Sequence, residues 1–323
     1  MKNQKIKWGI IGLGNIAHQF ATDLLLVEDA DLLAVASRDI LKADEFVAKY
    51  NAAKAYDSYE ALFADQEIDI VYIATPHDSH AELSIKALEN GRHVLCEKPI
   101  ALSYKDAERM IEASKKQNKF FMEAFWTRFI PTVQDVLAKV ENGIIGEANY
   151  IKADFAFIGN DVEGSRLFDK NRGGGALFDI GVYPLFLSYI LFGIPKEIIA
   201  KAVYHKSGID LQISMILQYE KAQAVLHSSI VSESDMKALI AGTKGRIELN
   251  SPWFMADGYS VFKEEQESVY NLPTLGKGYT HEIMECQDCI RNNQIESKLW
   301  SHQNSLDLSM MVEEVKTQIK LIF

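Results

Sequence analysis

The chain has 323 residues, of which 48% are hydrophobic and 24% are charged, and its formal net charge at pH 7 is −11. This length predicts about two domains, and the composition excludes a disordered chain, a collagen-like repeat and a coiled coil. The negative charge disfavours nucleic acid and anionic membranes as partners, so we expect neither.

Neither the cysteines nor the N-terminus indicates export. Three cysteines are too few for a disulfide framework, and Cys286 and Cys289 lack the second pair that structural zinc needs, so we expect no metal site. Residues 1–5 lack the apolar core of a signal peptide. The apolar stretch 176–192 includes a proline, a glycine and a carboxylate, which favours a buried helix over a membrane span. We therefore predict a cytoplasmic protein.

Short apolar runs alternate with amphipathic segments in the first third of the chain. Strands are predicted over 7–12, 32–37, 70–74, 93–97 and 120–125. Helix starts are predicted from three pairs, Asp57 with Glu60, Ser79 with Glu82 and Ser103 with Asp106, and helix ends at Asn90-Gly91 and Asn118. This alternation predicts an α/β domain with a parallel, doubly wound sheet.

The pattern changes after about residue 124 to near-consecutive strands joined by short turns. Strands are predicted over 146–159, 197–205, 211–219, 222–231, 237–242 and 246–250, followed by helices near 281–291 and 303–321. Such a run predicts an antiparallel sheet in an α+β domain. We divide the chain into domains 1–123 and 124–323, which abut directly because no Pro- or Ser-rich linker separates them.

A glycine-rich turn over 12–17, with the pattern G-x-G-x-x-A, follows the first predicted strand and opens a helix. Gly12 permits the tight turn, Gly14 lets the backbone approach a pyrophosphate, and amides at the helix start, including those of Asn15 and Ile16, bind the anion. Because the flanking strand and helix are both present, we interpret this as a dinucleotide-binding loop rather than a glycine turn without a nucleotide.

The end of the second predicted strand decides which dinucleotide is preferred. NAD-selective sites carry an acidic residue there, whereas this chain has Ser37-Arg38-Asp39. A guanidinium pairs bidentately with phosphate and stacks on adenine, so Ser37 and Arg38 predict NADP. NAD stays open, because a shift of two residues would bring the carboxylate of Asp39 into reach.

Four further segments carry a family resemblance. They are Ala74-Thr75-Pro76-His77-Asp78-Ser79-His80, Glu97-Lys98-Pro99, the segment 122–129 (MEAFWTRF) and the segment 173–184 (GGGALFDIGVYP). With the glycine loop, these resemble the Gfo/Idh/MocA family of oxidoreductases, and the last two resemble its dimeric dihydrodiol dehydrogenase branch. The resemblance implies an NAD(P)-binding Rossmann domain over 1–123. It also implies a C-terminal domain over 124–323 with an open, mostly antiparallel sheet for substrate binding and self-association, and a nicotinamide cofactor at the domain interface.

Hydride transfer to a carbonyl requires a proton donor and positive charge beside the reacting carbon. Lys98 follows the carboxyl end of a predicted parallel strand, where ligands bind in such sheets. Asp179 and Tyr183 are four residues apart, so they share one face of a helix that is otherwise apolar, where an isolated carboxylate is unfavourable. The resemblance implies that Tyr183 donates the proton, that Lys98 stabilises the phenolate and polarises the carbonyl, and that Asp179 orients the tyrosine or a substrate hydroxyl.

Other residues are weaker candidates. We expect Thr75, Pro76, His77 and Glu97 to contribute to the cofactor site, with a helix-start turn as the alternative for Pro76 and His77. We expect Trp126, Arg128, Phe155 and Arg172 to contact substrate, although interface or core packing would also explain the aromatic residues. His80, in the first turn of its helix, is interpreted as structural.

Together these features predict an NAD(P)-dependent oxidoreductase, NADP-preferring, that interconverts a secondary alcohol and a carbonyl on a sugar, polyol or trans-dihydrodiol. The alternative is a non-catalytic, NAD(P)-sensing regulator of the same fold. Retention of both Lys98 and Tyr183 favours the enzyme.

Overall fold

The computed structural model describes residues 5–162 and 165–321. The chain forms two compact units, the first comprising Met1–Phe129 and Leu275–Leu306 and the second Ile130–Thr274 and Asp307–Phe323. The predicted division after residue 123 falls near Phe129, where the first segment of this unit ends. The sequence did not predict that residues 275–306 return to the first unit. The expectation about a signal peptide concerns residues that lie mostly outside the described range.

The first unit is built on a six-stranded parallel sheet with the order β3-β2-β1-β4-β5-β6. Its strands are β1 (Ile6–Ile11), β2 (Ala30–Ala36), β3 (Lys54–Tyr56), β4 (Ile70–Ile73), β5 (His93–Glu97) and β6 (Phe121–Ala124). The connecting helices are α1 (Asn15–Leu24), α2 (Ile40–Tyr50), α3 (Tyr59–Ala64), α4 (His80–Glu89) and α5 (Tyr104–Gln117). The predicted doubly wound sheet is confirmed, and only the short β3 was missed.

The predicted helix ends are mostly correct. Ser103 caps α5 by accepting a hydrogen bond from the Asp106 amide at 3.1 Å, and Asn118 ends that helix in the left-handed conformation, with φ 52°. The capping prediction for α4 is wrong, because the Ser79 hydroxyl instead donates to Thr75 Oγ1 and to the Pro76 carbonyl. The cap of α3 is Ser58 rather than Asp57.

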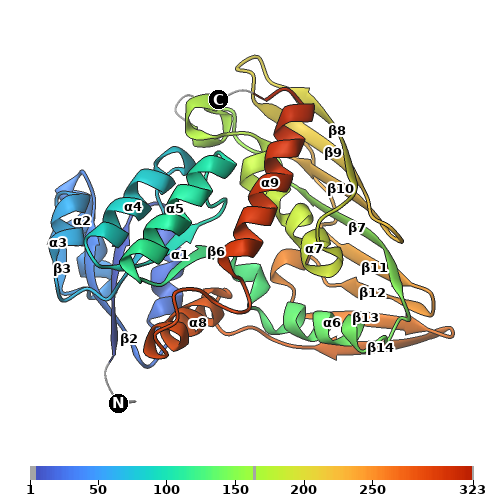
Figure 1. Ribbon diagram of the computed structural model, residues 1–323, viewed down its shortest axis with the longest axis horizontal. Helices are drawn as coiled ribbons and strands as arrows, with labels where there is room; N and C mark the ends of the chain where they lie inside the picture. The colour runs from blue at the N-terminus through green and yellow to red at the C-terminus, as the bar shows by residue number, and fades with distance from the viewer. Residues whose placement is uncertain (1–4, 163–164, 322–323) are drawn as a thin grey trace. The chain divides into compact units, whose positions relative to one another are not determined.

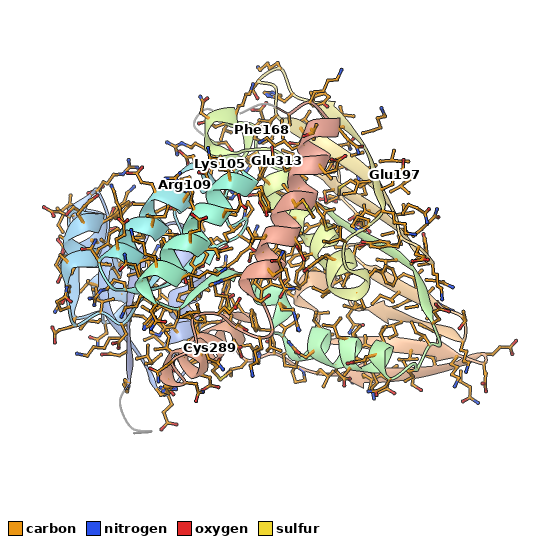
Figure 2. The ribbon with its side chains drawn as sticks, viewed as in Figure 1. Lys105, Arg109, Phe168, Glu197, Cys289 and Glu313 are labelled. Atoms are coloured by element: carbon orange, nitrogen blue, oxygen red, sulfur yellow. The ribbon has the colours of Figure 1, made fainter. Side chains whose placement is uncertain are left out.

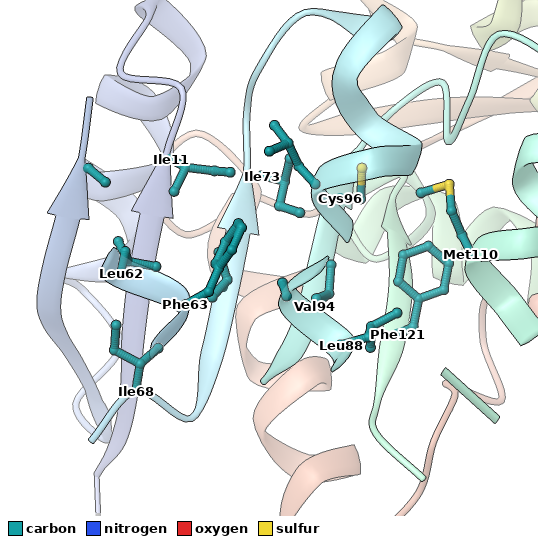
Figure 3. Close-up of a cluster of buried hydrophobic side chains, with 14 of the residues drawn as sticks. Ile11, Leu62, Phe63, Ile68, Ile73, Leu88, Val94, Cys96, Met110 and Phe121 are labelled. Atoms are coloured by element: carbon teal, nitrogen blue, oxygen red, sulfur yellow. The ribbon is translucent and has the colours of Figure 1, made fainter. Parts of the chain in front are cut away.

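A large apolar cluster lies between one face of this sheet and the helices α3, α4 and α5 (Figure 3). Leu62 and Phe63 of α3, Leu88 of α4 and Met110 of α5 pack against strand residues such as Val94. The strands are buried on both faces, which explains why they read as continuous apolar runs rather than as alternating ones. This core fixes the carboxyl ends of the strands, where the candidate site residues lie.

The second unit is built on an eight-stranded sheet with the order β14-β13-β12-β11-β7-β10-β9-β8. All neighbouring strands are antiparallel except β7 and β10, so the predicted mostly antiparallel sheet is confirmed. The strands are β7 (Ala148–Ala156), β8 (Glu197–Tyr204), β9 (Asp210–Gln218), β10 (Gln223–Ser229), β11 (Ala238–Gly242), β12 (Gly245–Leu249), β13 (Gly258–Lys263) and β14 (Gln266–Asn271). The hairpin of β13 and β14 was not predicted.

Helices α6 (Pro131–Glu141) and α7 (Val182–Phe192) lie on one face of this sheet (Figure 1). The helical stretch 170–192, which contains α7, is apolar and long enough to cross a membrane by length and composition alone, but 78% of its apolar window is buried. Burial within a packed unit favours a core helix, in agreement with the sequence prediction.

The segment 275–306 completes the first unit. It contains α8 (Tyr279–Arg291) and the start of α9 (His302–Gln318). The Phe121 amide donates to the Ile295 carbonyl at 3.0 Å, and His302 Nε2 lies 3.1 Å from the Phe121 carbonyl oxygen. These contacts cover the free edge of β6, the outermost strand of the parallel sheet.

Candidate functional site

The predicted site residues of the first unit gather at one edge of the parallel sheet. Gly12 follows β1, Arg38 follows β2, Thr75 follows β4 and Lys98 follows β5, each within two residues of the strand end. Strands β1 and β4 are adjacent, and the strand order reverses between them. The carboxyl edge at such a reversal is where open α/β sheets bind their ligands.

The glycine loop leaves room where a pyrophosphate needs it. Gly12 has φ +79°, and a Cβ there would lie 2.5 Å from the backbone carbonyl carbon of Ala74. Gly14 precedes α1, is exposed, and a Cβ on it would meet no atom within 4 Å. Asn15 and Ile16 are also exposed, at the first turn of α1, where amides have no partner inside the helix. The loop therefore fits a dinucleotide's phosphates.

The residues after β2 favour a phosphate over a ribose diol. The Asp39 carboxylate caps α2 by accepting from the Leu41 amide at 3.2 Å, and the Asp39 amide donates to the Ser37 hydroxyl at 3.1 Å. Arg38 is exposed, and its positive charge opposes the rise that burial causes in the pKa of the nearby Tyr59. Because the carboxylate serves the helix, the guanidinium is the charged group that this turn presents.

The turn after β4 is tied to the turn after β5. Thr75 and His77 are buried, at 7% exposure each. His80 is fully buried, and its two ring nitrogens lie 2.9 Å from the carbonyl oxygens of Thr75 and Pro99. The structural interpretation of His80 agrees with these contacts.

Lys98 lies in a turn whose backbone is held by buried groups. Its amide donates to Glu97 Oε2 at 3.2 Å, and the hydroxyl of the fully buried Tyr72 donates to Glu97 Oε1. The Lys98–Pro99 peptide is cis, and the Lys98 side chain is half-buried. Burial raises the pKa of Tyr72 well above its ordinary value, and the nearby Glu97 carboxylate raises it further, so the Tyr72 hydroxyl stays protonated and donates to Glu97.

In the second unit, three glycines fold the chain back onto the start of the apolar helix. A Cβ on Gly174 would lie 2.6 Å from the carbonyl oxygens of Arg166 and Leu167, and Gly175, at φ +114°, gives the Asp210 carboxylate room. Asp210 Oδ2 accepts from the Leu177 amide at 2.6 Å, which caps the helix. Burial raises the pKa of Asp210 to about 7. The segment 177–181 is a π-helical turn, a form common at functional sites.

This fold-back brings Arg166 to Asp179, with which it forms an ion pair. Arg166 begins the short turn that also carries the buried Phe168 (Figure 2). The expectation that Asp179 is an isolated buried carboxylate is wrong, because its side chain is 18% exposed and is paired with Arg166. Arg172 lies 3.6 Å from Asp169 in a mostly exposed pair.

Tyr183 lies in an aromatic cluster of the second unit. Its ring centroid is 5.3 Å from that of Phe155 on β7 and 5.4 Å from that of Phe254, and the two phenylalanines stack at 4.0 Å. Tyr183 is 5% exposed, while Phe155 and Phe254 are half-buried. The structure thus brings together two predicted residues and Phe254, which was not predicted.

Trp126 and Arg128 lie in a short turn after β6 of the first unit. The Trp126 ring stacks on Tyr279 of α8 at 5.3 Å, while burial lowers the pKa of the half-buried Arg128 and the Glu285 carboxylate opposes that shift. Both residues thus contribute to packing within the first unit, and their predicted contact with substrate stays a prediction.

Sequence reasoning missed Arg166, Phe254 and Asp210. None of these residues belongs to a recognisable sequence motif. Each meets its partner only through the folding of the chain. The three consecutive glycines were the available signal, because they indicate that something approaches the backbone closely. Among residues 5–162 and 165–321, no group of three or more His, Cys, Asp or Glu side chains is placed to hold a metal.

Two family models match the chain in the regions of its two sheets. Residues 6–125 match the oxidoreductase family with an NAD-binding Rossmann fold, and residues 133–248 match the GFO/IDH/MocA C-terminal domain. The chain belongs to the Gfo/Idh/MocA family. The predicted family, the NAD(P) cofactor and the oxidoreductase class are thereby confirmed.

Relatives within the Gfo/Idh/MocA family match nearly the whole chain. The trans-1,2-dihydrobenzene-1,2-diol dehydrogenase of Xenopus tropicalis is 34% identical over 330 residues, covering 98% of this chain and 99% of the relative. The enzyme of the same name from Homo sapiens is 30% identical over 331 residues, covering 98% of each.

Solved structures of family members share the fold. KijD10, a 3-ketoreductase from Actinomadura kijaniata in complex with NADP and TDP-benzene, superposes with a TM-score of 0.89 at 24% identity, covering 98% of each chain. The aldose–aldose oxidoreductase of Caulobacter crescentus complexed with glycerol gives a TM-score of 0.89 at 22% identity, again covering 98% of each chain. At these identities the likeness establishes the fold alone.

Proposed function

We propose that this protein is an NADP-preferring oxidoreductase that interconverts a secondary alcohol and a carbonyl on a sugar, polyol or trans-dihydrodiol. The observation that carries the proposal is the likeness, over 98% of the chain at 30–34% identity, to enzymes named for a trans-dihydrodiol. The retained Lys98, Asp179 and Tyr183 supply the chemistry that such a reaction needs.

The cofactor is held by residues at the carboxyl edge of the parallel sheet. Gly12, Gly14, Asn15 and Ile16 bind the pyrophosphate, and Ser37 and Arg38 bind the phosphate that distinguishes NADP. The remaining cofactor contacts come from Thr75, Pro76, His77, Glu97 and Lys98. When bound, the nicotinamide supplies or accepts the hydride.

The second unit supplies the proton chemistry. In the reductive direction Tyr183 donates a proton from its hydroxyl to the oxygen of the reacting carbonyl, and in the oxidative direction it accepts that proton back. Lys98 polarises the carbonyl and stabilises the phenolate that the donation leaves behind. The aromatic rings beside Tyr183 exclude water, which strengthens these interactions.

Asp179 orients a substrate hydroxyl or Tyr183, and Arg166 holds the Asp179 side chain in place through their ion pair. Arg166 therefore joins the proposed site, together with the wall residue Phe254. Trp126, Arg128, Phe155 and Arg172 stay in the proposal as substrate contacts.

The proposal is tested by following NADPH spectrophotometrically with a panel of aldoses, inositols, 1,2-diols and dicarbonyls. We expect Lys98→Ala and Tyr183→Phe to abolish turnover while NADPH still binds. Matched controls are Tyr189→Phe, a tyrosine of the same helix that donates to Asp307, and Lys105→Ala, an exposed lysine of α5 (Figure 2). Near-normal kcat in either site variant would refute that residue's role, and tight NADPH binding with no reaction across the panel would favour the regulator.

We further propose that the enzyme is a cytoplasmic homo-oligomer that assembles through the outer face of the eight-stranded sheet. Ile199, Ile216 and Val225 are neighbours in register across β8, β9 and β10, and they are 47%, 44% and 40% exposed. A contiguous apolar row on an uncovered sheet face is typical of an interface. Analytical ultracentrifugation of wild type and Ile216→Lys tests this, because a monomeric wild type would refute it.

A further inference from the structure

The turn that carries Lys98 is held by carboxylates on both sides. Glu97 Oε2 accepts from the Lys98 amide at 3.2 Å, and Glu123 Oε1 accepts from the Ile100 amide at 2.8 Å. The first carboxylate belongs to the strand that precedes the turn, whereas Glu123 comes from the neighbouring strand β6. The peptide groups on either side of Pro99 therefore have fixed partners, and the direction in which Lys98 leaves the backbone depends on both.

Glu123 is in turn fixed by the segment that returns to the first unit. Its second oxygen, Oε2, accepts from the Ser305 hydroxyl at 2.8 Å and from the indole N–H of Trp300 at 3.2 Å. Glu123 is 2% exposed and Trp300 is 1% exposed, so the contacts lie away from water. A buried carboxylate with three donors has a single favourable orientation, because turning it would leave donors unpaired.

We propose that Glu123 is a positioning residue for Lys98, which transmits the docking of residues 300–305 to the turn through the Ile100 amide. This inference rests on the proposed catalytic role of Lys98 and deepens it. It gives the segment 275–306 a function in catalysis besides its cover of the sheet edge. The sequence motif around residue 123 did not indicate this role.

The arrangement of hydrogen-bond donors around Glu123 permits a rescue experiment. In Glu123→Gln one side-chain oxygen remains, so either the Ile100 amide or the Trp300 indole faces an N–H group instead of an acceptor. Adding Trp300→Phe removes the competing indole N–H, and the new amide can then donate to the Ser305 hydroxyl while its oxygen accepts from Ile100. The double variant restores the contact that the proposal considers important.

The assay measures oxidation of trans-1,2-dihydrobenzene-1,2-diol with NADP, NADPH affinity and hydrogen exchange at the Ile100 amide. We expect Glu123→Gln to lower kcat by about 10- to 100-fold, as a displacement of a catalytic group by about 1 Å does. NADPH affinity should stay within about twofold, and Ile100 exchange should become faster. In the double variant kcat should recover to within about threefold of Trp300→Phe alone, with slow exchange restored.

A matched control separates positioning from stability. Arg291→Ala disturbs the same returning segment at a distance from residues 300–305, by breaking the ion pair of Arg291 with Asp29, and leaves the contacts of Glu123 and Ile100 in place. It should lower the melting temperature and leave kcat unchanged. If Glu123→Gln is insoluble, Ser305→Ala serves instead, with an expected loss in kcat of about threefold for one lost hydrogen bond.

The outcomes distinguish this inference from the proposed function. Lys98→Ala is measured in the same series. If it is inactive while Glu123→Gln keeps full kcat, or if the folded double variant shows no recovery, the positioning role is refuted and the catalytic role of Lys98 stands. If Lys98→Ala itself keeps kcat, the proposed function fails first.

Discussion

Substitution by alanine should affect two glycines of the dinucleotide loop differently. At Gly12 it should lower the stability of the fold, whereas at Gly14 it should weaken cofactor binding. Gly12→Ala places a Cβ 2.5 Å from both the Ala74 carbonyl carbon and the Thr75 amide nitrogen, at a φ of +79°. Backbone atoms cannot move aside as a side chain can. The left-handed conformation costs about 1–2 kcal/mol for a residue with a Cβ, and overpacking adds about 1–3 kcal/mol. We therefore expect a loss of about 2–5 kcal/mol in the free energy of unfolding.

Gly14→Ala should leave stability almost unchanged. Its φ of −90° and ψ of −171° suit alanine, and a Cβ there meets no atom within 4 Å. Alanine is a poorer N-cap than glycine, which costs about 0.5–1 kcal/mol of stability. Alanine also lowers the conformational entropy of the unfolded chain, and this offsets about 0.4–1 kcal/mol of that cost. The same Cβ fills the space into which a pyrophosphate must fit, so the dissociation constant for NADPH should rise on the order of tenfold, about 1.4 kcal/mol.

Thermal unfolding without ligand and titration calorimetry with NADPH separate the two effects. For a unit of this size, Gly12→Ala should lower the melting temperature by about 2–4 °C per kcal/mol lost. A Gly12→Ala protein that melts with wild type would contradict the packing argument. A Gly14→Ala protein that binds NADPH with unchanged affinity would show that the phosphates are held elsewhere.

Three further predictions concern charged groups. Arg166→Ala, which leaves the Asp179 carboxylate without its guanidinium, should lower kcat/KM on the order of tenfold, whereas Arg109→Ala, which breaks an exposed ion pair on α5, should not. The pKa of Asp210 is raised from 3.8 to about 7, so between these pH values the folded state binds this proton and the unfolded state does not. The stability that this proton provides is therefore lost as the pH rises from about 4 to about 7. Melting curves between pH 4 and pH 8 should accordingly be flatter for Asp210→Asn than for wild type, and equal slopes would contradict the argument. Arg38→Ala should reduce the ratio of kcat/KM for NADP over NAD, and a wild-type ratio below one would refute the preference itself.

Local signals in the sequence were sufficient to place the site residues at the carboxyl edge of the parallel sheet, although β3 and the returning segment 275–306 were not predicted. Each turn that follows a parallel strand carries its own chemistry, so the glycine loop, Arg38, Thr75 and Lys98 could be placed at one edge from strand order alone. The same holds for helix ends such as Ser103 and Asn118, where a side chain bonds to a backbone group a few residues away. Interactions of this kind are short in sequence and therefore leave a pattern.

The second unit shows where such inference ends. Asp179 and Tyr183 were found by their spacing, but Arg166 and Phe254 depend on a glycine fold-back and on a turn 71 residues beyond Tyr183. The chain by itself determined the two sheets, the nicotinamide cofactor and the candidate lysine and tyrosine. Only the tertiary structure decided which charge pairs with Asp179, which ring lies against Tyr183, and that Glu123 holds the turn after Lys98. Those contacts join residues distant in the chain, and their partners are selected by packing and by the need to satisfy buried polar groups, neither of which leaves a periodic signal in sequence.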